Sequence, residues 1–196
     1  MNLVEQMSFI RSGRMYNDLT PELIAAREEC SRAITRYNAS FGRHSFERES
    51  ILRSILGSIG EKVHFEPTFY CELGRNIKIG NNFYANVDCI LLDGGGIEIG
   101  DDVLLGPRVG IYTTNHAIDP VQRTQGACRL RPVRVGDKVW IGAGVHINPG
   151  ISIGEGSVIG AGSVVTADIP PGVIAAGVPC RVLREITAAD QMDYHP

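Results

Sequence analysis

The chain has 196 residues, a formal net charge of −3 and an apolar content of 43%. This length suits one domain with a small appendage, and it allows a core large enough for independent folding. No stripe of Lys and Arg stands out, which argues against a nucleic-acid-binding protein. We expect most arginines to lie on the solvated surface.

Five cysteines are scattered along the chain without a CxxC pair: Cys30, Cys71, Cys89, Cys128 and Cys180. We therefore expect neither a thiolate zinc site nor any other metal centre. Residues 1–14 contain Glu5 and Arg11 and no sustained apolar core, and no apolar run approaches the roughly 20 residues that span a bilayer. These features predict a cytoplasmic protein with free thiols, no signal peptide and no membrane segment.

Residues 1–61 are predicted to form a helical segment. Thr20, Pro21 and Glu22 make a strong helix start, with a hydroxyl at the N-cap, proline at the first position and an acid in the first turn. Ser45 is expected to cap a second helix that ends at Gly57 and Gly60. Both helices have an apolar face that needs a surface to cover. The faces consist of Ala26, Cys30, Ala33, Ile34 and Tyr37 in the first helix and Ile51, Leu52, Ile55, Leu56 and Ile59 in the second.

From about Lys62 a six-residue repeat replaces the helical spacing, and it is expected to extend to residue 180. Self-similarity at a fixed period is the signature of a solenoid. The first position of successive hexads is Val135, Ile141, Ile147, Ile153, Ile159 and Val165. The fifth position is small or branched, at Val139, Val145, Ile151, Ser157, Ser163 and Ile169. Upstream, the same phase appears at Ile99, Leu105 and Ile111.

An earlier set of residues, Ile79, Ala85 and Leu91, keeps the six-residue period but lies two residues out of phase with Ile99. We expect the "DGGG" stretch, Asp93 to Gly96, to absorb this slip as a bulge or a loosened corner.

The repeat predicts short strands that turn a corner every six residues, so that three faces close one coil of a β-helix. Coils pair with each other, which leaves sheet edges only at the two ends. The helices are expected to cover one end and the proline-containing C-terminal segment the other, with a tail over residues 181–196. After "IYTTNH" the repeat stops, and residues 115–132 are predicted to project as a loop with His116 at its root.

These motifs resemble a known family, the hexapeptide-repeat acyltransferases. The hexads, the break after "IYTTNH" and the closing "GVPCRVLREI" carry the resemblance. The helical start "RSGRMYNDLTPEL" and the stretch "EPTFYCELGRNIKIGNNFYAN" are similar to the maltose and galactoside O-acetyltransferase type. The resemblance implies a left-handed parallel β-helix, a homotrimer with active sites between subunits, and transfer of acetyl from acetyl-CoA to a sugar hydroxyl by direct attack on the thioester.

The resemblance also implies site residues. His116 occupies the position of the general base, a role that suits histidine because its unperturbed pKa of about 6.5 lies near working pH. Cys128, in the loop, is placed where it could contact acceptor or cofactor. The acceptor is expected to contact Asp18, Glu72, Tyr84, Asn86 and Asp93. Some relatives carry two consecutive acids where this chain has Asp93 and Gly94, and both Asn86 and Asp93 could instead be corner residues that satisfy backbone groups.

The acetyl-CoA site is implied to lie along the solenoid wall, in a groove between neighbouring subunits. Small residues there would let the cofactor approach the backbone, and guanidinium groups would bind its phosphates. The implied residues are Trp140, Gly142, Ala143, Ala161, Gly162, Thr166, Ala167, Arg181 and Arg184. Relatives often have Lys where this chain has Ala167, and simple packing is the alternative for Trp140 and for each small residue.

Three other functions are consistent with parts of the pattern. An antibiotic O-acetyltransferase shares the fold, the loop and a histidine, but the N-terminal helices and "NNFYAN" favour a sugar acceptor. A zinc-dependent carbonic anhydrase of this fold needs a close pair of histidines, and no second histidine lies near His116 in the sequence. A non-enzymatic scaffold would use the repeats only for assembly.

Overall fold

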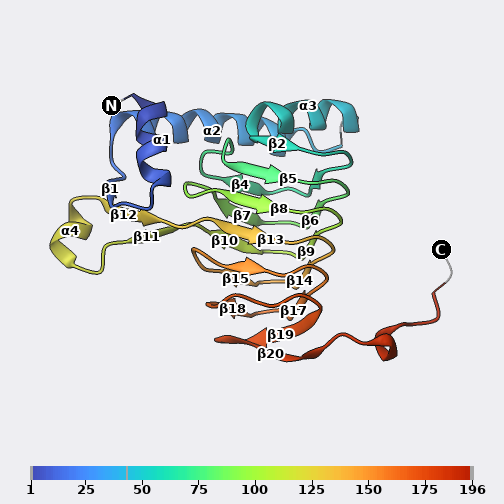
Figure 1. The fold of residues 1–196 in the computed structure, drawn as a ribbon. Coiled ribbons are helices and arrows are strands. Elements are labelled where there is room, and N and C mark those ends of the chain that lie inside the picture. Colours follow the sequence, from blue (N-terminus) through green and yellow to red (C-terminus); the bar gives the residue numbers. More distant parts are fainter. Residues whose placement is uncertain (1, 43, 195–196) are drawn as a thin grey trace.

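The computed structural model of the protein describes residues 2–42 and 44–194. Most of the chain winds into a parallel β-helix, in which the coils add short strands to three sheets (Figure 1). Sheet 1 consists of β2 (Ser58–Ile59), β5 (Ile77–Ile79), β8 (Ile97–Ile99), β13 (Val133–Val135) and β16 (Ser152–Ile153). Sheet 2 consists of β3 (His64–Phe65), β6 (Tyr84–Ala85), β9 (Leu104–Leu105), β14 (Trp140–Ile141), β17 (Val158–Ile159), β19 (Val173–Gly177) and β20 (Cys180–Glu185). Sheet 3 consists of β4 (Phe69–Cys71), β7 (Cys89–Leu92), β10 (Gly110–Tyr112), β15 (His146–Ile147) and β18 (Val164–Val165).

The predicted six-residue repeat is confirmed as the basis of this architecture. Every first-position residue of the hexads from Val135 to Val165 is buried. Ile141 of β14, for example, pairs with Leu105 of β9 on one side and with Ile159 of β17 on the other. Full burial of one such side chain contributes about 1.5–3 kcal/mol. The stack of branched side chains therefore forms the core, while backbone hydrogen bonds join each coil to the next.

The coils differ in length. Lys78 pairs with Glu98 at a spacing of 20 residues, whereas Arg134 pairs with Ser152 at a spacing of 18 (152 − 134). Between these coils, Glu98 pairs with Arg134 at a spacing of 36. The early coils thus contain two extra residues, and the third contains an insertion as long as a whole coil.

All the extra residues lie at the corner between sheet 3 and sheet 1, named here the long corner. The slip expected at Asp93 to Gly96 lies at this corner, between β7 and β8, and an extension of the same length occurs one coil earlier, between β4 and β5. The inserted residues of the third coil lie between β10 and β13, which is also at the long corner. Chain length therefore varies only where no strand has to pair.

Helices α2 (Pro21–Ala39) and α3 (Ser45–Ile55) cover the first coil, and α1 (Leu3–Arg11) lies to the side, against α2 and β12 (Ala127–Leu130) (Figure 1). The predicted start of α2 is confirmed, because Thr20 is the N-cap residue, its hydroxyl accepts from the Leu23 N–H, and Pro21 is the first helical residue. Tyr37 of α2 is fully buried, and its hydroxyl donates to the carbonyl of Phe65 at 3.0 Å. In the described part of the chain, no helix combines the length and the apolar character that crossing a membrane requires.

The second predicted helix differs at both ends. His44 is the N-cap residue in place of Ser45, it offers no side-chain hydrogen bond, and the helix stops at Ile55. Ile59, expected on the helix face, instead belongs to β2. The β-helix therefore begins a few residues before Lys62. The sequence does not show this, because a short run of apolar residues fits a helix as well as a strand.

The opposite end of the β-helix is closed by β20, which pairs antiparallel with β19 and extends sheet 2 to Glu185, beyond the expected limit at residue 180. A single 3₁₀ turn, η1 (Ala188–Asp190), follows in the tail.

The predicted loop of residues 115–132 is largely a β-hairpin that projects from the solenoid (Figure 1). Its strands are β11 (Thr114–His116) and β12 (Ala127–Leu130), with the short helix α4 (Pro120–Thr124) between them. Strand β1 (Tyr16–Asn17) pairs antiparallel with the other edge of β12. The resulting three-stranded hairpin sheet ties the segment between α1 and α2 to the insertion.

The return turn of the hairpin supplies a test of this packing. Gly126 has a φ of +85°, and a Cβ added there would lie 2.7 Å from Oδ1 of Asn17 in β1. We predict that Gly126→Ala lowers the free energy of unfolding by about 1–2 kcal/mol through backbone strain, and further through the clash with β1. Gly156→Ala is the matched control, because Gly156 has a φ of +69° with open space around it. Equal losses for the two variants in thermal unfolding would contradict the close contact of β1.

Candidate active site

The long corner gathers polar side chains from segments that are far apart in the sequence. Asp18 follows β1, Glu72 follows β4, Asp93 follows β7, and His116 is the last residue of β11. The segments that follow β4 and β7 lie in adjacent coils and are therefore stacked at this corner. The hairpin sheet brings β1 and β11 to the same side of the molecule. Of the predicted acceptor residues, these elements bring together Asp18, Glu72 and Asp93.

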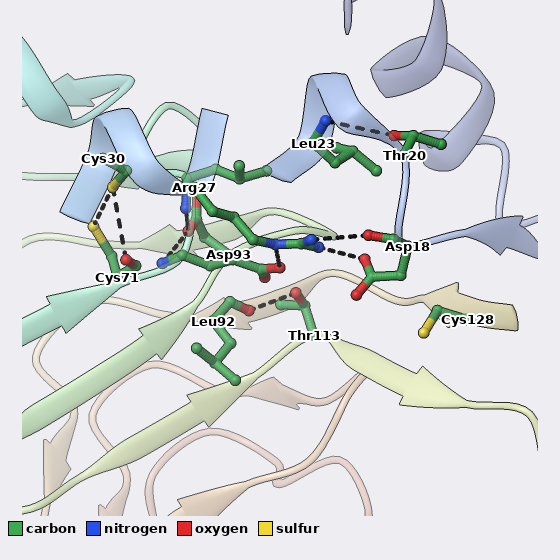
Figure 2. A network of polar contacts seen from close by, with 12 residues as sticks. Asp18, Thr20, Leu23, Arg27, Cys30, Cys71, Leu92, Asp93, Thr113 and Cys128 are labelled. Atoms are coloured by element: carbon green, nitrogen blue, oxygen red, sulfur yellow. Dashed lines mark hydrogen bonds and ion pairs between the residues drawn. The ribbon is translucent and has the colours of Figure 1, made fainter. Parts of the chain in front are cut away.

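Arg27 of α2 joins two of these carboxylates. Its Nε donates to Oε1 of Glu72 at 2.8 Å. Its Nη1 donates to the backbone carbonyl of Asp18 at 2.9 Å, and its Nη2 forms an ion pair with Oδ1 of Asp18 (Figure 2). The hydroxyl of Tyr16 donates to the same Asp18 oxygen at 3.0 Å. Most arginines are expected on the solvated surface, but Arg27 is the centre of a partly buried network.

Glu72 has one oxygen in this ion pair and one that is unsatisfied. Burial raises the pKa of Glu72 above its usual range, although the charge of Arg27 acts in the opposite direction. Its Oε2 atom is buried and has no hydrogen-bond partner among the described residues. A Cβ added at Gly94 would lie 3.2 Å from this oxygen, so the glycine leaves room beside it. A buried acceptor without a donor is costly to a protein alone, and it is suited to a ligand hydroxyl.

Asp93 is fully buried, and backbone groups use its carboxylate. Oδ1 accepts from the N–H groups of Glu72 at 3.1 Å and Leu73 at 2.8 Å, and Oδ2 accepts from the N–H of Asn76 at 3.2 Å. Burial raises the pKa of Asp93, and these hydrogen bonds act to lower it. These hydrogen bonds agree with the alternative role of Asp93, that of a corner residue whose side chain satisfies backbone N–H groups. A contact between Asp93 and a sugar hydroxyl stays a prediction.

His116 is exposed on β11 and faces Cys128, its direct partner on β12. The distance between His116 Nδ1 and Cys128 Sγ is 3.0 Å. Cys128 is fully buried in the central strand of the hairpin sheet, with Tyr16 of β1 as its partner on the other side. Burial, and in second place the charge of Asp18, raises the pKa of the Cys128 thiol to about 11. The contact between Cys128 and His116 cannot be predicted from the sequence, because it depends on the register of the hairpin.

Tyr84 and Asn86 lie away from the long corner of the same chain. Tyr84 belongs to β6 in sheet 2, where its ring stacks on His64 with 5.8 Å between the centroids. Asn86 follows at the corner between sheets 2 and 3, and its Oδ1 accepts from the Val87 N–H at 2.8 Å. A single chain therefore does not assemble all the predicted acceptor residues around His116.

The predicted donor-site residues lie on the later coils. Gly142 is buried, and a Cβ there would come within 2.6 Å of the backbone nitrogen of Ala161, which supports the packing role. Arg184 already forms an ion pair with Asp190 at 2.6 Å. The remaining residues of the set are exposed: Trp140, Ala143, Ala161, Gly162, Thr166, Ala167 and Arg181. Their roles toward acetyl-CoA stay predictions.

The five cysteines are free thiols, as expected. Cys30 of α2 and Cys71 of β4 are buried with their sulfurs 3.5 Å apart, so they join a helix to the first coil. Across residues 2–42 and 44–194, no group of three or more His, Cys, Asp and Glu side chains is arranged to hold a metal ion.

Comparisons with known proteins agree with the fold. Residues 10–60 match the maltose acetyltransferase hexapeptide capping motif, and residues 132–167 match the bacterial transferase hexapeptide (six repeats). The galactoside O-acetyltransferase of Escherichia coli strain K12 is 42% identical over 185 residues, which cover 94% of this chain and 91% of that protein.

Two solved structures are similar over nearly the whole chain. A galactoside acetyltransferase in complex with coenzyme A has a TM-score of 0.91 and 41% identity, covering 100% of this chain and 96% of that one. A maltose O-acetyltransferase from Clostridium difficile 630 has a TM-score of 0.89 and 46% identity, covering 95% of this chain and 98% of that one.

A parallel β-helix of hexads with a helical cap and an inserted hairpin is the architecture of the hexapeptide-repeat transferases. With identities above 40% over nearly full length, the chain belongs to the hexapeptide-repeat acyltransferases, in the maltose and galactoside O-acetyltransferase type. The predicted resemblance and fold class are thereby confirmed, and the protein is an acetyltransferase.

The hydrogen bonds of Asp93 lead to a test of its role. In Asp93→Asn an amide nitrogen replaces one acceptor oxygen and faces a backbone N–H. We expect the free energy of unfolding to fall by about 1–3 kcal/mol, the range for an unsatisfied buried group. Asp101→Asn is the control, because Asp101 is only partly buried and its Oδ1 alone accepts the Asn81 N–H. Denaturant unfolding measures the difference. Unchanged stability together with a raised KM for the acceptor would assign Asp93 to ligand binding instead.

Proposed function

We propose that this acetyltransferase moves acetyl from acetyl-CoA to a hydroxyl of a sugar of the maltose, glucose or galactoside type, with His116 as general base. The position of His116 carries the proposal. Its imidazole is exposed on the hairpin, and the carboxylates of Asp18 and Glu72 lie close enough to the neighbouring Cys128 to influence its thiol. Relatives named for galactoside and maltose acetylation support the class of acceptor.

The chemistry asks for a base because a hydroxyl is a weak nucleophile while it keeps its proton. The His116 imidazole accepts that proton as the oxygen attacks the thioester carbonyl. The carbon–sulfur bond then breaks, and the departing CoA sulfur takes the proton from the imidazolium. A positioned base of this kind contributes about 10²–10⁴-fold to the rate.

Acceptor binding follows from the carboxylates at the long corner. A sugar presents several hydroxyls, and each one that is buried in the complex needs a hydrogen-bond partner. The unsatisfied Oε2 of Glu72 is an acceptor for one of them. Arg27 holds Glu72 and Asp18 in place, so both carboxylates are oriented before the sugar arrives.

We further propose a homotrimer in which neighbouring chains complete each site. The outer face of sheet 1 is charged, with Glu98 bound to Lys78 and Arg134 at 3.3 Å. The outer face of sheet 2 instead exposes Leu104 and, directly beside it, Trp140. An exposed apolar face next to a charged one supports burial of sheet 2 between subunits.

The placement of Tyr84 and Asn86 supports the same arrangement. Both lie on sheet 2 or at its edge, so a neighbouring chain can bring them to the long corner. Trp140, the small residues on the later coils and Arg181 would then line a groove for acetyl-CoA between subunits. The unpaired thiols favour the reducing cytoplasm as the compartment.

The role of His116 is tested by His116→Ala. We expect kcat to fall by about 10²–10⁴-fold, with the affinity for acetyl-CoA measured by calorimetry unchanged. His44→Ala, which alters an exposed residue before α3, should keep full activity. Near-normal turnover of His116→Ala would overturn the proposal. A panel of sugars and antibiotic hydroxyls tests the acceptor class, and preference for an antibiotic would reassign it.

The assembly is tested by light scattering after size exclusion. One chain has a mass of 21.3 kDa, so a trimer should have about 64 kDa (3 × 21.3). Leu104→Arg places a charge on the apolar face of sheet 2, and we expect it to shift the mass toward that of the monomer. Lys78→Glu on sheet 1 is the control and should leave the trimer intact. A wild-type mass of 21 kDa would reject the assembly.

A further inference from the structure

The catalytic histidine proposed above has a neighbour whose chemistry bears on its protonation. His116 and Cys128 are directly opposed in the antiparallel pair of β11 and β12, and Nδ1 of the ring lies 3.0 Å from Sγ. At this distance the two atoms share a hydrogen bond, and either of them could supply the hydrogen. Which atom does so decides which ring nitrogen is free to act as a base.

The surroundings of Cys128 show that its sulfur is not an attacking group. The residue has no exposed surface, because β12 is the central strand of the hairpin sheet. The raised pKa of its thiol keeps it protonated at neutral pH. Tyr16, Asp18, Arg27 and Glu72 are the polar groups around it, and the two carboxylates disfavour a thiolate further. A neutral, buried thiol is a poor nucleophile toward a thioester.

The geometry leaves only one ring nitrogen of His116 accessible to the sugar. Nδ1 points at the buried sulfur, so Nε2 is the ring nitrogen that a sugar hydroxyl can reach from outside. A neutral imidazole carries a single N–H, and Nε2 can accept a proton only when that hydrogen is on Nδ1. The hydrogen bond must then run from Nδ1–H to Sγ.

We propose that Cys128 is a positioning residue: its Sγ accepts a hydrogen bond from Nδ1–H of His116 and holds the imidazole in the tautomer whose Nε2 takes the proton of the acceptor hydroxyl. This inference rests on the proposed function. In the transfer step the hydroxyl proton moves to Nε2, the oxygen bonds to the acetyl carbon, and the CoA sulfur leaves and receives the same proton. Nδ1–H stays on the ring throughout, and its bond to Sγ strengthens while the ring is cationic.

Two substitutions separate the hydrogen bond from the packing. Cys128→Ala removes the sulfur that accepts the hydrogen bond. We expect kcat to fall about threefold to tenfold, the range that one neutral hydrogen bond is worth. KM for acetyl-CoA should not change. Cys128→Ser keeps an acceptor at the same place, and it should retain at least about half of the wild-type kcat. Cys89→Ala is the matched control, because it removes a buried thiol that faces the carbonyl of Gly106.

The tautomer is measured directly by ¹⁵N NMR of the imidazole at a pH where the ring is neutral. We expect the hydrogen of His116 on Nδ1 in the wild type and in Cys128→Ser, and a shift toward Nε2–H in Cys128→Ala. A purely structural role of Cys128 would lower stability without moving these resonances. Wild-type His116 with its hydrogen on Nε2 would overturn the proposal.

The failure of this inference can be told apart from failure of the proposed function. If His116→Ala is inactive while Cys128→Ala has the kcat and the tautomer of the wild type, only the role of Cys128 is refuted. If His116→Ala is active, the general base itself is refuted. Intact mass after incubation with acetyl-CoA alone should show no acetylated Cys128. An acetylated Cys128 that turns over on addition of sugar would make the thiol a nucleophile and contradict the proposal.

Discussion

The hydrogen-bonded stacking of coils is the constraint on which the rest of the structure depends. Each inner strand of the β-helix pairs with the coils before and after it, and the inward branched side chains fill the core of the tube. The insertion of one residue within a strand would shift every inward side chain that follows to the outer face. Length can therefore change only at a corner. The protein uses one corner for this purpose, with two extra residues in its early coils and a projecting hairpin in the third.

The polar interior of that corner is organised by one helix residue. Arg27 carries a positive charge into a site that contains three carboxylates, those of Asp18, Glu72 and Asp93. Without it, the partly buried carboxylates of Asp18 and Glu72 would lie near each other with no counter-charge, which is unfavourable. Because Arg27 belongs to α2, the helical cap stabilises the site as well as the first coil. Strand β1 extends this connection to the hairpin that carries His116.

The six-residue repeat allows the class of fold to be predicted from the sequence. Six hexads in one phase, from Val135 to Val165, predict a stack of coils, and the two-residue slip at Asp93 indicates an enlarged corner. The sequence-based predictions are wrong where the run of patterned residues is short. Ile59 fits the apolar face of a helix as well as the first strand of the solenoid, and only pairing with β5 distinguishes the two. The insertion contains no repeat, so the sequence predicts a projecting loop there but not its hairpin.

The sequence by itself determined the class of fold, the cap of α2 by Thr20 and the break at His116, because each of these depends on residues close together along the chain. Only the tertiary structure decided the partners of the site: Arg27 between two carboxylates, and Cys128 against His116. These contacts join α2 to the first coil and one hairpin strand to another. Their formation depends on strand register and on the stacking of coils, which no local spacing of residue types records.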